Sequence, residues 1–322
     1  MKSFFVLFLL FVLLSPVKAQ YDFDEIERVR MVEAKVKTQT EWTYDYVNGK
    51  PSSTGYKSSV TKFDTRGNIT EIANYNANGK LISTIIYQYD AYNNRVNFER
   101  YDEKRVLKYS QKIVYNDNGK KIREYGKNGM EQYNNTFTYD GNGKLTEINY
   151  TANNMLVEKR QFVYSGNKTE ISVFNASNIL SFRQENTYNE NGFLLSELRK
   201  GVQGNVIHSL NMQYSNLGEL LQEIKKRADD KLDYHKTYHY DNNNRPIKEE
   251  TINLDGTKFI SREYQYNNSG DLILESWRKN ERATEFSTKK FTYDSKRIYT
   301  EVDSYFATYK LNSLYKYVYE YY

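Results

Sequence analysis

The sequence predicts an all-β repeat protein, with about twenty antiparallel strands in an up-and-down meander that forms a curved or spiralling sheet. Three observations predict it. Aromatic residues recur every 24–27 residues, polar turn residues follow them, and apolar and polar residues alternate in the segments before them. The chain has 322 residues with 32 Tyr and only 3 Pro. Scarce Pro suits a sheet, because Pro cannot donate a ladder hydrogen bond.

Residues 1–19 have the layout of a secretory signal peptide. Lys2 is followed by an unbroken apolar run, Phe4 to Leu14, and Ala19 is a small residue suited to cleavage before Gln20. The run is too short to cross a bilayer as a helix, and no later segment is long enough for a transmembrane helix. We therefore expect the mature protein to be exported and to be secreted, periplasmic or at the cell surface.

Residues 20–58 are expected to form an N-terminal capping strand region. Residues 24–28 could form one helical turn. Alternation from Val32 to Tyr44 then predicts a long opening strand, and Asn48 to Pro51 turns the chain into the first repeat. Because no Gly/Ser/Pro-rich linker follows, we expect one repeat domain.

A repeat of about 26 residues organises residues 59–322. One aromatic residue, the anchor, opens a turn in each repeat. The anchors are Phe63, Tyr89, Tyr115, Tyr139, Tyr164, Tyr188, Tyr214, Tyr240, Tyr266, Tyr293 and Tyr319. Most are followed at once by Asp, Asn or Ser, and four residues later by Gly or Asn. Short polar residues start turns by bonding their own backbone, and Gly or Asn tolerates positive φ.

Each repeat also contains a second turn, ten to twelve residues after the anchor, as at Leu254-Asp255-Gly256. The residue two before the anchor is usually apolar, and the residue between them is mostly polar. This period of two is typical of a half-buried antiparallel strand. Each repeat is therefore predicted to hold two strands and two turns.

The segment Tyr139 to Leu145, with the sequence YDGNGKL, resembles the YD repeat of RHS and teneurin-type proteins. Similar fragments are Tyr240 to Arg245, Tyr266 to Leu272 and Tyr115 to Ile122. The resemblance covers about residues 55–322 in period and turn position, although Asn or Ser often replaces Asp. It implies a curving strip of β-hairpins, which in large family members winds into a shell around a toxin. This chain is far shorter and resembles a free-standing strip of such repeats.

Composition excludes several classes of site. The chain has no Cys, which excludes disulfides, Cys-ligated metals and a cysteine nucleophile. A net charge of +5 with interspersed signs gives little support to nucleic-acid binding. His235 and His239 share a strand face about 13 Å apart, too far for one metal ion, and His208 lies elsewhere. We expect no metal site and no cofactor.

Glutamates recur in one column: Glu71, Glu124, Glu147, Glu170, Glu197, Glu223, Glu249, Glu275 and Glu301. A basic set could face them across neighbouring strands: Arg160, Arg183, Lys236, Arg262, Lys289 and Lys316. Glycosidases use a pair of carboxylates for catalysis. A column that recurs in nearly every repeat is better interpreted as a structural ladder, in which each pair contributes about 0.2–1 kcal/mol. We therefore expect no catalytic residue.

The anchor tyrosines are expected to form the core or the covered concave face of the strip, stacked at the strand spacing. Aromatic residues at the second turns are the candidate binding site, because an exposed aromatic surface often binds a partner. They are Trp277, Tyr75, Tyr101, Tyr125, Tyr150 and Tyr305.

The sequence thus predicts an exported YD-repeat-like structural or interaction protein that binds glycan or protein along an aromatic-rich sheet surface, without catalysis. One alternative is an outer-membrane β-barrel, since the strands alternate and Tyr315 to Tyr321 has aromatic residues at every second position. Short turns, charged strands and a mean hydropathy of −0.84 count against it. Another alternative is a carbohydrate-active enzyme, for which Gly201 to Lys231 is the best candidate break in the repeat. The end strand Tyr315 to Tyr322 is expected to pair with a partner or a second copy.

Overall fold

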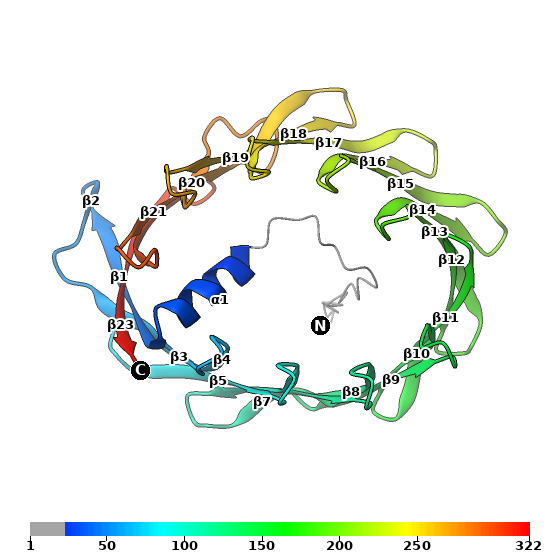
Figure 1. Cartoon of the computed structure of the whole chain (residues 1–322), viewed down its shortest axis with the longest axis horizontal. Coiled ribbons are helices and arrows are strands. Elements are labelled where there is room, and N and C mark those ends of the chain that lie inside the picture. The colour runs from blue at the N-terminus through cyan, green and yellow to red at the C-terminus, as the bar shows by residue number, and fades with distance from the viewer. Residues whose placement is uncertain (1–22) are drawn as a thin grey trace, which may run out of the picture.

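The fold is seen in a computed structural model, which describes residues 23–322. The predicted signal peptide, residues 1–19, lies outside the described residues. One short helix precedes a continuous antiparallel meander (Figure 1). The elements are α1 (Phe23–Glu33), β1 (Val36–Val47), β2 (Lys50–Pro51), β3 (Tyr56–Phe63), β4 (Ile69–Tyr75), β5 (Leu81–Tyr89), β6 (Arg95–Asp102), β7 (Leu107–Tyr115), β8 (Lys121–Asn128), β9 (Glu131–Tyr139), β10 (Leu145–Ala152), β11 (Met155–Ser165), β12 (Lys168–Asn175), β13 (Leu180–Tyr188), β14 (Leu194–Gly201), β15 (Val206–Tyr214), β16 (Leu220–Arg227), β17 (Leu232–Tyr240), β18 (Pro246–Asn253), β19 (Lys258–Tyr266), β20 (Leu272–Trp277), β21 (Ser287–Tyr293), β22 (Tyr299–Phe306) and β23 (Leu311–Tyr321).

The meander closes into a barrel. Strand β1 pairs with β3 along one edge and with β23 along the other. All strands except the short β2, that is 22 strands, form the ring in Figure 1. The antiparallel meander that the sequence predicts is confirmed, but the open curved strip is wrong. The last strand returns beside the first, and each satisfies the other's unpaired backbone groups.

Closure also corrects the expected association through the end strand. Strand β23 pairs with β22 on one side, and its partners in β1 run from Val36 with Tyr321 to Asp45 with Ser313. The strand expected to recruit a partner or second copy is therefore paired within the chain. A closed barrel has no free edge to template association.

A register shift beside most anchors bends the hairpins. In the hairpin of β9 and β10, Tyr139 pairs with Leu145 but Thr138 pairs with Glu147, so one residue is left over. The same shift occurs at the corresponding place in most repeats. A bulge of this kind bends the strand and increases its twist. The repeat therefore carries its own source of curvature.

The turns after the anchors follow the predicted chemistry. In the turn after Tyr139, Asp140 Oδ1 accepts hydrogen bonds from the backbone N–H groups of Asn142 (3.0 Å) and Lys144 (2.8 Å). Gly143 has a φ of +74°, a conformation that L side chains rarely adopt. The turn positions predicted from the Asp/Asn and Gly spacing are confirmed here.

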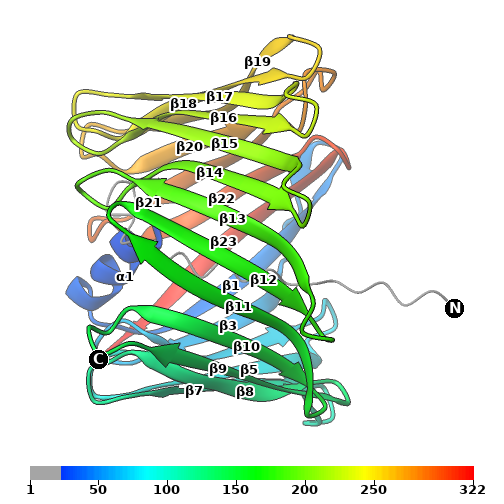
Figure 2. The same cartoon turned by 90° about the vertical axis from the view of Figure 1, so that its right-hand side faces the viewer.

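The helix α1 lies inside the ring, at one end of the barrel (Figures 1 and 2). It has 11 residues, where the sequence suggested a single turn. Met31 packs with Val36, Phe63 and Ile298 in a buried cluster beneath the closing strands. Phe63 and Ile298 come from distant parts of the chain, which explains why the local sequence did not indicate the helix's length.

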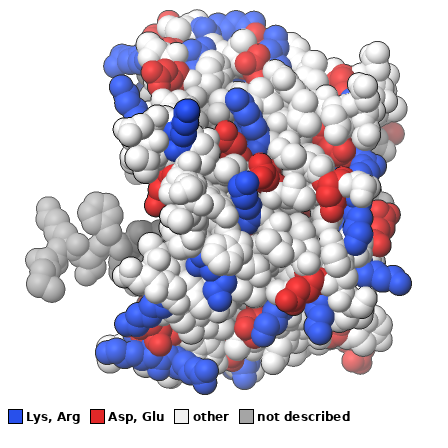
Figure 3. All heavy atoms as spheres, turned by 90° about the vertical axis from the view of Figure 1, so that its left-hand side faces the viewer, with Lys and Arg blue, Asp and Glu red and all other residues white. Residues whose placement is uncertain are grey.

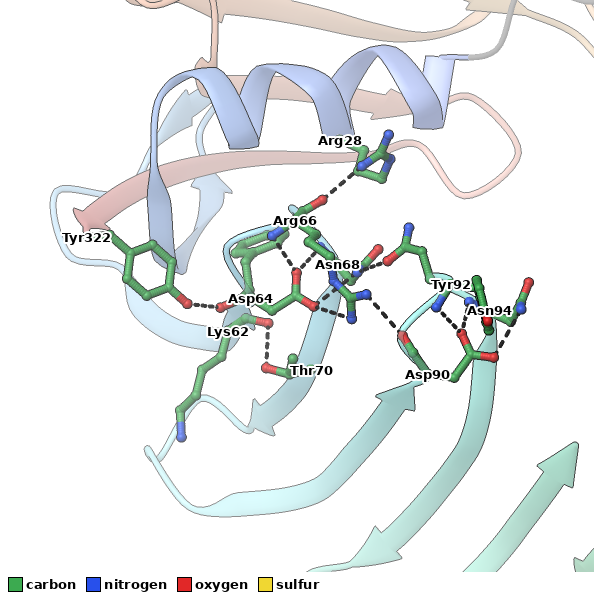
Figure 4. A network of polar contacts seen from close by, with 12 residues as sticks. Arg28, Lys62, Asp64, Arg66, Asn68, Thr70, Asp90, Tyr92, Asn94 and Tyr322 are labelled. Carbon is green, nitrogen blue, oxygen red and sulfur yellow. Dashed lines mark hydrogen bonds and ion pairs between the residues drawn. The ribbon is translucent and has the colours of Figure 1, made fainter.

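Polar contacts fix α1 to the turns at this end. Arg28 donates to the backbone carbonyl of Arg66 (2.8 Å), and Arg66 donates in turn to the carbonyl of Asp90 (2.9 Å), as Figure 4 shows. Further along the helix, Arg30 binds Asp271 at 2.5 Å, and this carboxylate also accepts hydrogen bonds from Arg297. The helix is thus attached to turns on two sides of the ring.

The segment Gly201 to Lys231 does not interrupt the repeat. It contains β15 and β16 with turns of ordinary length, and both strands are fully paired with their neighbours. The irregularity suspected there reflects only the composition of the turns. Within the described residues, no helix has the length and apolar character needed to cross a membrane.

Candidate functional site: the barrel lumen

The lumen contains a cavity of about 1600 Å³, lined mainly by strands β10 to β23. Alternation sends every second side chain of a strand toward it. Its aromatic lining consists of Tyr139, Phe162, Tyr164, Phe182, Tyr188, Phe193, Tyr214, Tyr238, Tyr240, Tyr264, Phe291, Tyr293, Tyr299 and Tyr317. Acidic and basic side chains lie between these rings. The cavity is therefore both aromatic and charged.

The anchor tyrosines use their hydroxyl groups to join successive repeats. Seven of them donate to the carbonyl that begins the second strand of the preceding repeat. These bonds are Tyr115 to Arg95 (3.2 Å), Tyr139 to Lys121 (2.8 Å), Tyr164 to Leu145 (2.9 Å), Tyr240 to Leu220 (2.9 Å), Tyr266 to Pro246 (2.8 Å), Tyr293 to Leu272 (2.8 Å) and Tyr319 to Tyr299 (2.6 Å). This bond gives a reason for Tyr rather than Phe at the anchor, because Phe would leave the carbonyl without this donor.

We expect Tyr240→Phe to lower the free energy of unfolding by about 1 kcal/mol, the usual net contribution of one hydrogen bond. The matched control is Tyr214→Phe, because the Tyr214 hydroxyl donates only to the Met212 sulfur, at 3.3 Å. Urea unfolding followed by tyrosine fluorescence measures both. An equal decrease in the free energy of unfolding in the two variants would contradict a stabilising role for the hydrogen bond from Tyr240 to the carbonyl.

These tyrosines also predict how stability depends on alkaline pH. Burial raises the pKa of Tyr240 to about 12, with a contribution from Glu219, and burial raises the pKa of Tyr293 to about 12 against the opposing charge of Arg30. An unfolded tyrosine has a pKa of about 10. The folded protein therefore disfavours the phenolate, and this stability is complete below pH 10 and is lost as pH rises toward 12. Thermal midpoints measured from pH 8 to 12 should fall above pH 10, less steeply in a Tyr240→Phe, Tyr293→Phe double variant.

The glutamate column divides between the two faces of the sheet. Glu249 pairs with the lumenal Tyr238, whereas Glu301 pairs with Thr292 on the opposite face. The lumenal members are Glu124, Glu197, Glu223, Glu249 and Glu275, and the outer members are Glu71, Glu147, Glu170 and Glu301. A single surface ladder, as the sequence suggested, is therefore wrong.

The number of residues between each glutamate and its anchor explains this division. Every lumenal glutamate stands nine residues after its anchor. Three outer ones, Glu71, Glu147 and Glu301, stand eight after theirs, and Glu170 follows a shorter turn. Because neighbouring strand residues face opposite sides, one residue decides between the lumen and the outer surface. This difference in spacing was visible in the sequence.

The predicted ion pairs form on both faces. In the lumen, Lys236 binds Glu249 (3.2 Å) and Arg262 binds Glu275 (2.5 Å). Outer pairs include Arg183 with Glu170 (3.6 Å) and Lys316 with Glu301 (2.8 Å). Arg160 departs from the prediction and binds Glu158 (2.7 Å).

One lumenal cluster that sequence reasoning missed surrounds Glu197. Its carboxylate contacts His208 Nε2 (2.8 Å) and accepts a hydrogen bond from Gln184 (2.9 Å), whose amide oxygen accepts one from Arg199 (2.8 Å). The Arg199 guanidinium lies over the Phe182 ring at 4.5 Å. The residue types are ordinary strand residues, so only the pairing of three strands reveals the cluster.

A second lumenal cluster joins two tyrosines to one carboxylate. Tyr234 and Tyr238 both donate to Glu223, the latter at 3.3 Å. Burial, with the nearby negative charge of Glu223, raises the pKa of both phenols. Both hydroxyls therefore stay protonated at neutral pH and act as donors.

The candidate binding residues do not gather on one surface. Trp277 pairs with the lumenal Arg262, and Lys289 lies over its ring at 6.0 Å. Tyr150 alternates with the lumenal Ile148 and is covered by Arg160 at 5.3 Å. These two aromatics therefore face the lumen.

The other four candidates lie on the outer face by strand alternation. Tyr101 donates to Glu99 (2.7 Å), Tyr125 is covered by Arg123 (4.6 Å), Tyr75 is covered by Lys57 (4.2 Å), and Tyr305 donates to Glu285. The six residues therefore form no common rim, and their role in binding stays a prediction.

The outer face also carries two of the three histidines, His235 and His239, on β17. His239 contacts Glu250 at 2.8 Å. Across residues 23–322, no group of three or more His, Cys, Asp or Glu side chains is placed to hold a metal ion.

Comparison with solved structures gives matches of low sequence identity and low TM-score. No family model and no curated protein matches the chain. A chain titled TcdB2-TccC3-Cdc42 is 15% identical with a TM-score of 0.32, and the match covers 80% of this chain but only 17% of that one. A porin-like protein from Bacteroides uniformis ATCC 8492 is 14% identical with a TM-score of 0.33, covering 65% of this chain and 94% of that one. A porin-like protein from Bacteroides vulgatus ATCC 8482 is 13% identical with a TM-score of 0.23, covering 88% and 98%. At these TM-scores the matches identify no family for this chain.

Proposed function

We propose that this chain is an exported β-barrel of the cell envelope that binds a glycan or protein segment inside its lumen and has no catalytic role. The observation that carries this proposal is the closed ring around a cavity of about 1600 Å³ lined by aromatic and charged side chains. Small-molecule pockets usually measure about 300–1,000 Å³. The larger volume favours an extended or oligomeric ligand.

The absence of Cys from the chain permits a direct test. A Met212→Cys variant places one thiol in the lumen, and a Thr292→Cys variant places one on the outer face. We expect glycan or peptide libraries to contain a ligand that protects the first thiol from a maleimide and leaves the second reactive. Protection of neither thiol, or equal protection of both, would refute lumenal binding.

A second candidate is the outer-membrane β-barrel, and closure is the observation that favours it. A sheet in lipid must have no unpaired edge, and bacterial outer-membrane barrels have an even number of antiparallel strands. The 22-strand ring fits this alternative better than it fits the open binding strip that the sequence suggested.

The outer face favours a barrel surrounded by water. Figure 3 shows charged side chains of both signs spread over one side of the molecule. Outer charges placed within strands by the register are Lys62, Glu71, Lys112, Arg123, Glu147, Glu170, Arg183, Glu185, Glu263, Lys290, Glu301 and Lys316. Each Lys or Arg facing lipid at mid-bilayer costs about 2–4 kcal/mol.

Fractionation separates the two candidates. Release by osmotic shock or into the medium, with no heat-dependent shift in gel mobility, is expected for the barrel in water. Recovery from the detergent-extracted outer membrane as a heat-modifiable band would favour the second candidate instead.

A further inference from the structure

Three consecutive repeats place the same set of side chains on one lumenal wall. Each set contains an apolar or aromatic residue two before an anchor, a glutamate nine after it, and a cation four before the next anchor. The sets are Met212, Glu223 and Lys236; Tyr238, Glu249 and Arg262; and Tyr264, Glu275 and Lys289. We name these nine residues the triplet wall. All of them except Lys236 line the cavity.

From the triplet wall we infer that the lumen binds an uncharged oligosaccharide, with one disaccharide unit opposite each repeat. This inference rests on the proposed function of the lumen as a ligand site and names the class of ligand. Three features support the inference: the spacing of the triplets, their charge balance and the chemistry of their side chains.

Spacing favours a glycan over a peptide. Equivalent positions recur every second strand, and neighbouring strands lie about 4.8 Å apart, so the triplets repeat every ~10 Å. A disaccharide unit of an extended glycan has about this length and presents the same hydroxyls at each step. An extended peptide advances about 3.3 Å per residue, so its two-residue side-chain period of ~6.6 Å falls out of step with the wall.

Charge balance favours a neutral ligand. The triplet wall holds three glutamates and three cations, and four of these six charges form ion pairs with one another. Lys236 binds Glu249 (3.2 Å) and Arg262 binds Glu275 (2.5 Å), while two tyrosines donate to Glu223. Because the wall's positive and negative charges balance, neither a polyanion nor a polycation gains a net electrostatic attraction from it.

The side chains also suit sugar hydroxyls. Ionised carboxylates and cations form stronger hydrogen bonds than neutral groups, and each hydroxyl can donate and accept. The rings of Tyr238 and Tyr264 supply apolar area beside them for the C–H faces of sugar rings. Two triplets thus offer the cavity an acceptor, a donor and an aromatic surface, and the first offers the Glu223 carboxylate and the Met212 side chain.

The first experiment is calorimetric titration of the whole protein with neutral homo-oligosaccharides of two to eight sugars and with uronate oligosaccharides of matched length. We expect a neutral series to bind, with affinity rising in steps of two sugars and levelling off at six, and the uronates to bind at least about tenfold more weakly. Equal or stronger binding of uronates, or no binding by any neutral series, would overturn the inference.

Single substitutions then locate the site. Glu249→Gln removes the charge of a triplet carboxylate and is expected to weaken neutral-glycan binding about tenfold. The matched control Glu301→Gln makes the same change on the outer face and should leave affinity unchanged. If Glu249→Gln fails to fold, Lys289→Gln tests another triplet. An equal loss in the outer control would contradict the assignment.

The thiol-protection assay distinguishes failure here from failure of the proposed function. If only a peptide protects the lumenal thiol of Met212→Cys, lumenal binding stands and the oligosaccharide assignment is wrong. If a neutral glycan protects this thiol, lumenal binding and the oligosaccharide assignment are both supported. If neither a peptide nor a neutral glycan protects it, both proposals are wrong.

Discussion

Removal of residues 311–322 is expected to open the barrel and convert the protein into oligomers or aggregates. The deletion removes β23, which supplies partners for β1 from Val36 to Asp45 and for β22 from Glu301 to Phe306. It exposes two long strand edges at once, and unpaired edges template association. Size-exclusion chromatography with light scattering should show the intact protein as a single species and the truncated chain as a broad distribution.

A point substitution in β23 tests the same strand pairing with a smaller change. Tyr317→Pro removes a ladder donor from a strand that is paired on both sides, which a sheet interior does not tolerate. The control is Tyr309→Ala, whose side chain is 79% exposed in the turn before β23. If the truncated protein and Tyr317→Pro both keep the elution volume of the intact barrel, closure by β23 is not what holds the ring together.

Replacement of Asp271 is expected to have the largest effect of any single change at the helix. Asp271 is 3% exposed and accepts hydrogen bonds from Arg30 (2.5 Å), Arg297 (2.6 Å) and Asn267 (2.9 Å). Burial alone raises its pKa, but the hydrogen bonds from Arg297 and Asn267 and the charge of Arg30 outweigh burial and hold the pKa below its usual range. Asp271→Ala leaves Arg30 buried without its carboxylate, which costs about 3–5 kcal/mol.

Urea unfolding and limited proteolysis check this expectation. Asp271→Ala should lower the unfolding midpoint and make α1 susceptible to proteases that the parent resists. Glu301→Ala is the control, because its ion pair with Lys316 is exposed, with 39% and 42% of the two side chains accessible, and such pairs contribute about 0–1 kcal/mol. A similar small decrease in the unfolding midpoint of both variants would show that the contacts of Asp271 do not hold the helix in place.

Local sequence was sufficient to predict the repeat, because its signals lie within a few residues of each anchor. Asp140 and Gly143 meet the geometric demands of a turn by themselves, and the aromatic residue two before the anchor marks a strand. Closure was not predictable in this way. Its partners, such as Thr40 with Val318, lie at opposite ends of the chain, and neither strand carries a local mark of the other.

The face on which a candidate side chain lies depends on its distance in residues from the anchor. After the bulge that follows an anchor, odd positions face the lumen and even positions face outward. Trp277 and Tyr150 stand eleven residues after their anchors and face the lumen, while Tyr75, Tyr101 and Tyr305 stand twelve after theirs and face outward. The faces on which these aromatic residues lie depend on a bulge that the alternation alone does not reveal.

The position of β1 between β3 and β23 also determines when folding can finish. Among the strands of residues 23–322, β1 emerges first during synthesis, yet its second neighbour, β23, emerges last. Each hairpin can form soon after its residues emerge, but ring closure must wait for contacts across almost the whole chain, and such contacts form slowly. Until then the growing sheet keeps an open edge at each end. A prematurely ended chain would keep those edges permanently, so the ring distinguishes complete chains from incomplete ones in a form that proteases and chaperones can recognise.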